Sequence, residues 1–81
     1  MNQYITTFYS HFGAMRYKRM CNQLGLEARE MPVPRTLSSS CGTCVSYYSQ
    51  DIVFDDKFKD EIEQIVKVTD TGYENIYSSE E

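Results

Sequence analysis

Two cysteines three residues apart, Cys41 and Cys44, have the clearest capacity for chemistry in this chain. Two thiols at this spacing can close a disulfide, ligate a metal ion, or act as a nucleophile and a resolving thiol. Gly42 between them lets the backbone turn tightly. The competing interpretation is that both cysteines are small core residues. The serines at 38–40 place Cys41 in a polar loop, whereas Cys44 begins a predicted strand and can point inward.

Zinc would need two ligands beyond Cys41 and Cys44, and the candidates are His11 and Cys21. These two lie ten residues apart in one predicted helix, about 15 Å along its axis. Both cannot reach one ion, so we expect no metal site within the chain and no cofactor. A cysteine at position 21 is better explained as a small core residue than as a metal ligand. His11 is better explained as a solvated polar residue than as a ligand or a base.

A thioredoxin-like function would require the Cys-x-x-Cys segment to open a helix, because the helix N-terminus lowers the pKa of the first thiol. Here Val45-Ser-Tyr-Tyr48 follows and favours a strand. Any activation of Cys41 must therefore come from Arg35, from the serine hydroxyls or from backbone N–H groups of the loop.

The composition limits the class of protein. The 81 residues are 41% hydrophobic and 25% charged, as in one small globular domain. The net charge of −4 argues against nucleic acid or acidic membranes as partners, and the seven tyrosines are better explained as sheet residues than as base-stacking ones. The chain shows no signal-peptide pattern and no apolar run near the ~20 residues of a membrane helix, so we expect a cytoplasmic protein. The odd number of cysteines favours reduced thiols over a set of disulfides.

The first half of the chain predicts a strand, a helix and a second strand. Residues 3–9 are mostly β-branched or aromatic and predict a strand, after which Ser10 can cap a helix over 11–24. Gly25 suits the left-handed end of that helix, and residues 26–33 predict a strand whose prolines place it at a sheet edge. The helix should bury the stripe Ala14, Tyr17, Cys21 and Leu24.

The second half predicts the same elements in reversed order. A loop over 38–43 leads to a strand over 44–48 and a helix over 55–67, and a last strand follows over 73–77. The second helix should bury Phe58, Ile62, Ile65 and Val66 and pair Lys57 with Glu61 and Glu63 with Lys67. The order strand–helix–strand–strand–helix–strand predicts an α+β, ferredoxin-like fold in one domain, residues 1–81. A four-stranded antiparallel sheet should carry both helices on one face, with residues 78–81 as a frayed tail.

The chain resembles a family of small bacterial proteins described as selenium/sulfur-carrier-like. The resemblance rests on Pro32-Val-Pro-Arg35, two spacer residues, Ser38-Ser-Ser-Cys-Gly42 and a closing Ile76-Tyr77, and it covers nearly the whole chain. It implies that Cys41 is the reactive residue, with Arg35 and Gly42 as its surroundings. Cys44 departs from the family pattern, which has a small apolar residue there. A sulfur-relay family marked by Cys-Pro-x-Pro is not indicated, because Met31 replaces the cysteine and a thioether forms no persulfide.

Three hypotheses follow for the function. In the first, the chain is a carrier that holds sulfur or selenium on Cys41, loaded by a cysteine desulfurase-type donor and unloaded by an acceptor protein. In the second, Cys41 and Cys44 form a thiol–disulfide redox or sensor module. In the third, the chain is an interaction domain with incidental cysteines. The candidate site comprises Cys41 and Cys44, with Arg35, Ser38, Ser39, Ser40 and Gly42 around them.

The order of thiol reactivity is also predicted: Cys41 should react fastest and Cys21 slowest. If Cys44 attacks the inner sulfur of a loaded Cys41, a disulfide forms and sulfide or selenide is released. Replacing Cys44 with serine should then prolong the loaded state.

Overall fold

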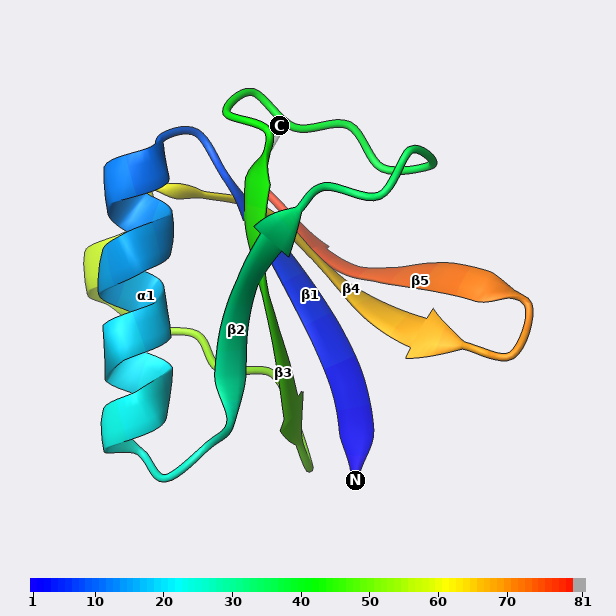
Figure 1. The fold of residues 1–81 in the computed structure, drawn as a ribbon, viewed down its shortest axis with the longest axis horizontal. Coiled ribbons are helices and arrows are strands. Elements are labelled where there is room, and N and C mark those ends of the chain that lie inside the picture. The colour runs from blue at the N-terminus through cyan, green and yellow to red at the C-terminus, as the bar shows by residue number, and fades with distance from the viewer. Residues whose placement is uncertain (80–81) are drawn as a thin grey trace.

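The described part of the chain forms one antiparallel sheet with a single α-helix on one face (Figure 1). The computed structural model describes residues 1–79. Their elements are β1 (Asn2–Phe8), α1 (His11–Gln23), β2 (Ala28–Pro32), β3 (Thr43–Ser49), a one-turn 3-10 helix η1 (Asp56–Phe58), β4 (Ile62–Thr69) and β5 (Gly72–Ser78). The strands lie in the order β2-β3-β1-β4-β5, so the first strand of the chain occupies the centre of the sheet.

The first half of the chain folds as its sequence predicts. Ser10 caps α1, since its hydroxyl accepts a hydrogen bond of 3.1 Å from the backbone N–H of Gly13. Gly25 follows the helix with φ 84°, which is the left-handed conformation expected there. Strand β2 is an edge strand and ends at Pro32, whose nitrogen cannot donate to a ladder. Leu24 was expected in the buried stripe but is 61% exposed at the C-cap.

The ferredoxin-like prediction is wrong, because the described residues contain five strands and one α-helix in place of four strands and two helices. The helix predicted over 55–67 is the single turn η1 followed by β4. Strand β4 pairs with β1 on one side and with β5 on the other. The last strand was correctly predicted, but it forms a hairpin with β4 instead of following a helix.

Three physical features favour a strand over a helix at 62–69. The segment contains β-branched residues at five of its eight positions, which suits a pleated sheet better than a helix. Asp70-Thr71 links paired residues Thr69 and Gly72, and such a two-residue loop joins antiparallel strands. The predicted Glu63–Lys67 pair does not form: Lys67 lies opposite Glu74 of β5, and Glu63 binds the loop before β3.

The connection between β3 and β4 is held by two buried tyrosines instead of by helical hydrogen bonds. The Tyr17 hydroxyl donates to the Val53 carbonyl at 2.6 Å, and the Val53 N–H donates to the Tyr47 hydroxyl at 3.0 Å. Burial raises the pKa of both tyrosines above their ordinary value. Both backbone groups of Val53 are thus satisfied without a helix.

The sheet buries side chains on both faces. The face under α1 carries the larger cluster, called here the helix-side core. The opposite face carries a smaller one, called here the far-face cluster. The helix-side core consists of Tyr4, Phe8, Ala14, Tyr17, Cys21, Ala28, Val45, Tyr47, Phe58, Ile62 and Ile65. The far-face cluster consists of Ile5, Cys44 and Val66, with Met31, Val33, Leu37 and Val68 packed against it.

The first two residues of the predicted frayed tail, Ser78 and Ser79, are bonded to the sheet. Ser78 closes β5, and the Ser79 N–H donates to the Glu63 carbonyl at 3.0 Å. The rest of the predicted tail, residues 80 and 81, lies outside the described residues. Within 1–79, no helix is long and apolar enough to cross a membrane.

Candidate functional site

The segment between β2 and β3, residues 33–42, forms a loop that crosses one end of the sheet, and it is called here the cysteine loop. Its ends are joined by a hydrogen bond of 3.2 Å from the Val33 N–H to the Gly42 carbonyl. Within it the Leu37 N–H donates to the Pro34 carbonyl at 3.0 Å and closes a β-turn. Gly42 has φ 75°, which a residue with a side chain rarely adopts. The loop reaches to the side of the sheet away from α1 (Figure 1).

Each of the three serines is tied to a neighbouring strand. The Ser38 carbonyl accepts from the Gln64 side chain at 3.2 Å, and the Ser39 hydroxyl donates to the Phe8 carbonyl at 3.3 Å. Ser40 makes two bonds to the Glu63 carboxylate, 3.1 Å from its N–H and 3.0 Å from its hydroxyl. The serines predicted to surround the reactive thiol therefore fix the course of the backbone that leads to Cys41.

Cys41 lies at the end of the cysteine loop nearest α1. It is half-buried and packs against the helix-side core, and its thiol donates a hydrogen bond to the Thr43 carbonyl at 3.4 Å. Thus the apolar side of the residue rests on the core while the other side reaches solvent. This combination of a fixed backbone and partial access suits a thiol that must exchange a group with a second molecule.

Cys44 occupies a different environment, although it is only three residues away. It is fully buried in the far-face cluster, and its sulfur lies 3.7 Å from the Pro32 carbonyl oxygen. Burial and, to a smaller extent, the nearby Cys41 raise its pKa from 9.0 to about 11. Val33 and Leu37 of the cysteine loop pack against its cluster. The two thiols are unbonded, and the core clusters they contact lie on opposite faces of the sheet.

Cys21 is the third free thiol and lies on the buried side of α1. Burial raises its pKa from 9.0 to about 11, which a hydrogen bond from Tyr17 partly offsets. Its place in the helix-side core confirms the prediction that it is a small core residue.

Arg35 lies in the β-turn of the cysteine loop and is exposed. Among residues 1–79, it makes no ion pair, and neither its guanidinium nor a serine hydroxyl is hydrogen-bonded to the Cys41 sulfur. Activation of Cys41 by Arg35, by the serine hydroxyls or by backbone N–H groups therefore stays a prediction.

Two shallow hollows adjoin the cysteine loop. One of about 330 Å³ is lined by His11, Glu30, Met31, Pro32, Gly42 and Thr43. The other, of about 230 Å³, is lined by Tyr9, Ser38, Glu63, Gln64 and Ser78. His11 is largely exposed, with its ring 3.6 Å from the Glu30 carboxylate, and the described residues hold no group of three potential metal ligands.

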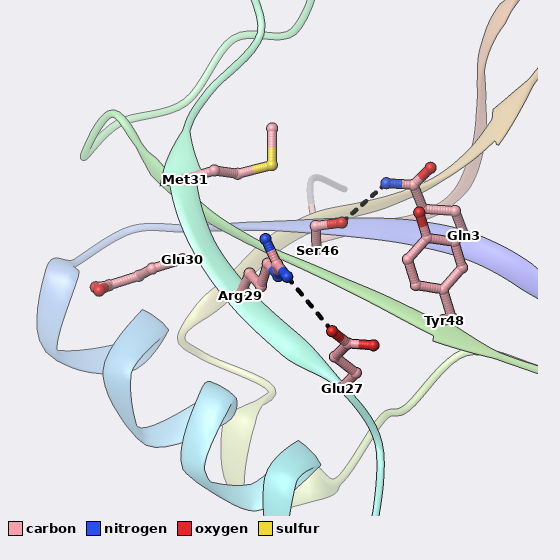
Figure 2. Close-up of a pocket in the computed structure, with 7 residues that line it drawn as sticks. All are labelled: Gln3, Glu27, Arg29, Glu30, Met31, Ser46 and Tyr48. Atoms are coloured by element: carbon pink, nitrogen blue, oxygen red, sulfur yellow. Dashed lines mark hydrogen bonds and ion pairs between the residues drawn. The ribbon is translucent and has the colours of Figure 1, made fainter.

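A larger hollow of about 590 Å³ lies over the uncovered part of the far face, and it contains no thiol. Figure 2 shows its polar lining, in which Arg29 bonds Glu27 at 3.4 Å and Gln3 bonds Ser46 at 3.0 Å. Glu30 points the opposite way, toward α1. Because Arg29 pairs with Glu27, Gln3 pairs with Ser46, and no thiol lines this hollow, it is a weaker candidate than the cysteine loop.

Sequence reasoning missed Glu63 and Gln64, the side chains that hold the cysteine loop from β4. The helix predicted over 55–67 paired Glu63 with Lys67 and gave Gln64 no role. The Asp-Thr-Gly turn after a β-branched run was the signal for a hairpin, and it would have placed both residues in a strand.

The comparisons with known proteins bear on the family of the chain. No curated protein and no solved structure matches the chain. One family model does match, over residues 3–78, and it includes the cysteine loop and every element of the sheet. The chain therefore belongs to the family described as "Putative Se/S carrier protein-like".

Proposed function

We propose that this chain is a carrier that holds one sulfur or selenium atom on Cys41, as a persulfide or selenosulfide, and is not an enzyme that turns over a substrate. The observation that carries the proposal is the contrast among the three cysteines. Cys41 reaches solvent from an anchored loop, whereas burial encloses Cys21 and Cys44 and raises the pKa of each to about 11. Membership of the selenium/sulfur-carrier-like family supports the same class of function.

The loading step needs only a thiolate and a donor persulfide, R–S–S–H. The Cys41 thiolate attacks the outer sulfur, so that a new S–S bond forms while the donor's S–S bond breaks, and the donor sulfur leaves as a thiolate. One S–S bond replaces another, and no oxidant or cofactor is consumed. Unloading is the same exchange with an acceptor thiol, and a terminal selenium atom follows the same course. A cysteine desulfurase-type donor and a separate acceptor protein, both in the reducing cytoplasm, fit this chemistry.

The loop residues have supporting roles in this proposal. Ser38, Ser39 and Ser40 hold the backbone so that Cys41 stays accessible, and Gly42 provides the left-handed turn without a side chain that would crowd a donor. Nothing lies within 4 Å of the position that a Gly42 Cβ would occupy. Arg35 is exposed and free of ion pairs within the described chain, so it could attract an anionic terminal sulfur or selenium.

Cys44 has a conditional role in the proposal. If it attacks the inner sulfur of a loaded Cys41, a Cys41–Cys44 disulfide forms and hydrosulfide or hydroselenide leaves. That reaction needs the Cys44 thiolate, which a pKa of about 11 makes scarce at neutral pH, and it needs access that Val33 and Leu37 restrict. We therefore propose that Cys44 resolves the adduct only when the cysteine loop lifts from the sheet.

Intact-mass spectrometry tests the proposal and separates it from a redox module. Wild type, treated with a persulfide donor, should gain one sulfur atom, and a selenopersulfide should add one selenium atom. Cys41→Ser should gain nothing, whereas Cys21→Ser should behave as wild type. A redox module would instead lose two hydrogens on mild oxidation and gain no atom. An unmodified wild type, or equal gain in Cys41→Ser, would refute the carrier proposal.

A further inference from the structure

The outer face of α1 exposes two large apolar side chains, Phe12 and Met15, in line with the basic Arg19. Phe12, Met15 and Arg19 recur at spacings of three and four on the side opposite the buried Ala14 and Tyr17. Phe12 is 70% exposed and Met15 43% exposed. A helix that packs on a sheet normally presents polar residues to water, so this stripe is a candidate contact surface.

The same helix concentrates positive charge on an acidic chain. Arg16, Lys18 and Arg19 lie in α1, which contains no acidic residue. The other five basic residues are outnumbered by the twelve acidic ones, so the formal charge is +3 on the helix and −7 on the rest of the chain. Lys57 of η1 adds to the positive side, since it lines one hollow together with Arg16 and Arg19.

Most of this charge is available to a partner. Arg16 is used internally, because its guanidinium bonds the Glu61 carboxylate at 2.7 Å. Lys18, Arg19 and Lys57 make no ion pair within residues 1–79. A surface with apolar residues and a rim of unpaired positive charge has the usual anatomy of a protein interface.

This face lies at the same end of the molecule as Cys41. The start of α1 and the end of the cysteine loop come together at one end of the sheet (Figure 1). His11, next to Phe12, lines one hollow with Gly42 and Thr43, and Cys41 packs on the same side of the sheet as the helix. A protein that reaches Cys41 with its own reactive group would therefore meet the first turns of α1.

We infer that the outer face of α1, centred on Phe12, Met15 and Arg19, is the docking surface for the donor protein. The surface of that donor around its persulfide should be acidic with an apolar centre. The inference rests on the proposed function, since it assigns a partner to Cys41. An acidic protein fits better than a membrane or nucleic acid, because the whole chain is acidic and α1 is a segment in which basic residues occur without any acidic one.

The test compares two donors on the same variants. The protein donor is a cysteine desulfurase that carries a persulfide formed from L-cysteine, and the small donor is glutathione persulfide. Arg19→Glu should slow loading from the protein donor by about 5–10-fold, because the reversed charge opposes the acidic partner during encounter. Arg29→Glu is the matched control, an equal change of charge at an exposed arginine on the opposite face of the sheet, and it should change the rate less than about twofold.

A second pair of variants tests the apolar centre. Phe12→Ala should slow loading from the protein donor by about 5–30-fold if the ring is an interface anchor. Leu24→Ala, a similarly exposed apolar residue at the other end of α1, should leave the rate unchanged. All four variants should load from glutathione persulfide at the wild-type rate, which shows that Cys41 and the fold are intact.

The outcomes separate this inference from the proposed function. If glutathione persulfide fails to load the wild type, the carrier function itself fails. If it loads every variant and the protein donor also loads every variant at the wild-type rate, the docking surface is wrong. The inference is likewise overturned if the wild type binds anionic phosphatidylserine vesicles and Arg19→Glu abolishes that binding, since the face would then contact a membrane. It is also overturned if the wild type forms a concentration-dependent dimer that Arg19→Glu abolishes, since the face would then contact a second copy of the chain.

Discussion

Replacing Glu63 with glutamine should loosen the cysteine loop and expose Cys44. The carboxylate now accepts two bonds from Ser40, at 3.1 and 3.0 Å. A glutamine carries no charge: its oxygen can accept from the Ser40 N–H and its NH2 group can donate to the Ser40 hydroxyl, so two charge-assisted bonds become at best two neutral ones. Bonds to charged groups contribute about 1.5–3 kcal/mol and neutral ones about 0.5–1.5 kcal/mol. Because Ser40 is exposed to water, we expect the substitution to weaken the attachment of the loop by about 1–2 kcal/mol.

A loss of this size should raise the population of the lifted loop about 5–30-fold. The remaining anchors, Gln64 to Ser38 and Ser39 to Phe8, should keep the sheet itself folded. Timed alkylation with peptide mapping in the native state measures the effect. We expect Cys44 to be labelled about 5–30-fold faster in Glu63→Gln than in wild type, with Cys21 unchanged.

Glu74→Gln on the exposed face of β5 is the matched control and should alter neither rate. Equal acceleration at Cys21 and Cys44 would mean that the variant destabilises the whole fold. Unchanged labelling of Cys44, together with faster hydrogen exchange at the Ser40 amide, would refute the idea that the loop controls access to Cys44.

Three further results are expected. In wild type at pH 8, Cys41 should be alkylated faster than Cys21, and the reverse order would contradict the assignment of the accessible thiol. Raising the pH from 9 to 11 should lower the free energy of unfolding. Over that range Cys21 and Cys44 lose their protons in the unfolded chain but keep them in the folded protein, because burial raises their pKa to about 11. Each thiol should lower the free energy of unfolding by about 2–3 kcal/mol at most. Denaturant titrations of Cys44→Val should show a smaller fall in this free energy. Gly13→Ala should lower the free energy of unfolding by no more than about 1 kcal/mol in the same titrations, since its Cβ would displace the Glu61 carboxylate from Arg16; an unchanged midpoint would show that Glu61 moves freely.

The first half of the fold could be predicted because its signals are local and agree with one another. Ser10, the stripe of α1 and Gly25 specify one helix, and the prolines after residue 31 place β2 at an edge. The second half could not be decided locally. Ile62, Ile65 and Val66 fit a helical stripe, but the same residues form a central strand once β1 and β5 are available on either side.

The candidate site was predictable as a set of residues but not as an arrangement. The motif identifies Cys41 and its serines from sequence alone. Which side of the sheet each thiol contacts depends on the pairing of β3 with β1 and β2, because a shift of one residue would exchange the two faces. The anchors Glu63 and Gln64 depend in turn on β4 being a strand.

If Cys41 carries the sulfur or selenium atom as proposed, the register of β3 explains how a second thiol can be present without shortening the lifetime of the loaded form. Cys44 lies directly between Thr7 of β1 and Met31 of β2, on the face that the cysteine loop covers. In this position a cysteine packs as a small apolar residue, and its raised pKa keeps it protonated at neutral pH. Cys44 becomes a competent nucleophile only when the loop lifts. A partner that pulls the loop from Glu63 during docking would therefore trigger release of the bound atom. If so, the loaded form of Glu63→Gln should decay faster than that of wild type, and adding Cys44→Ser should restore its lifetime. A fast decay that persists in the double variant would show that the atom leaves without Cys44.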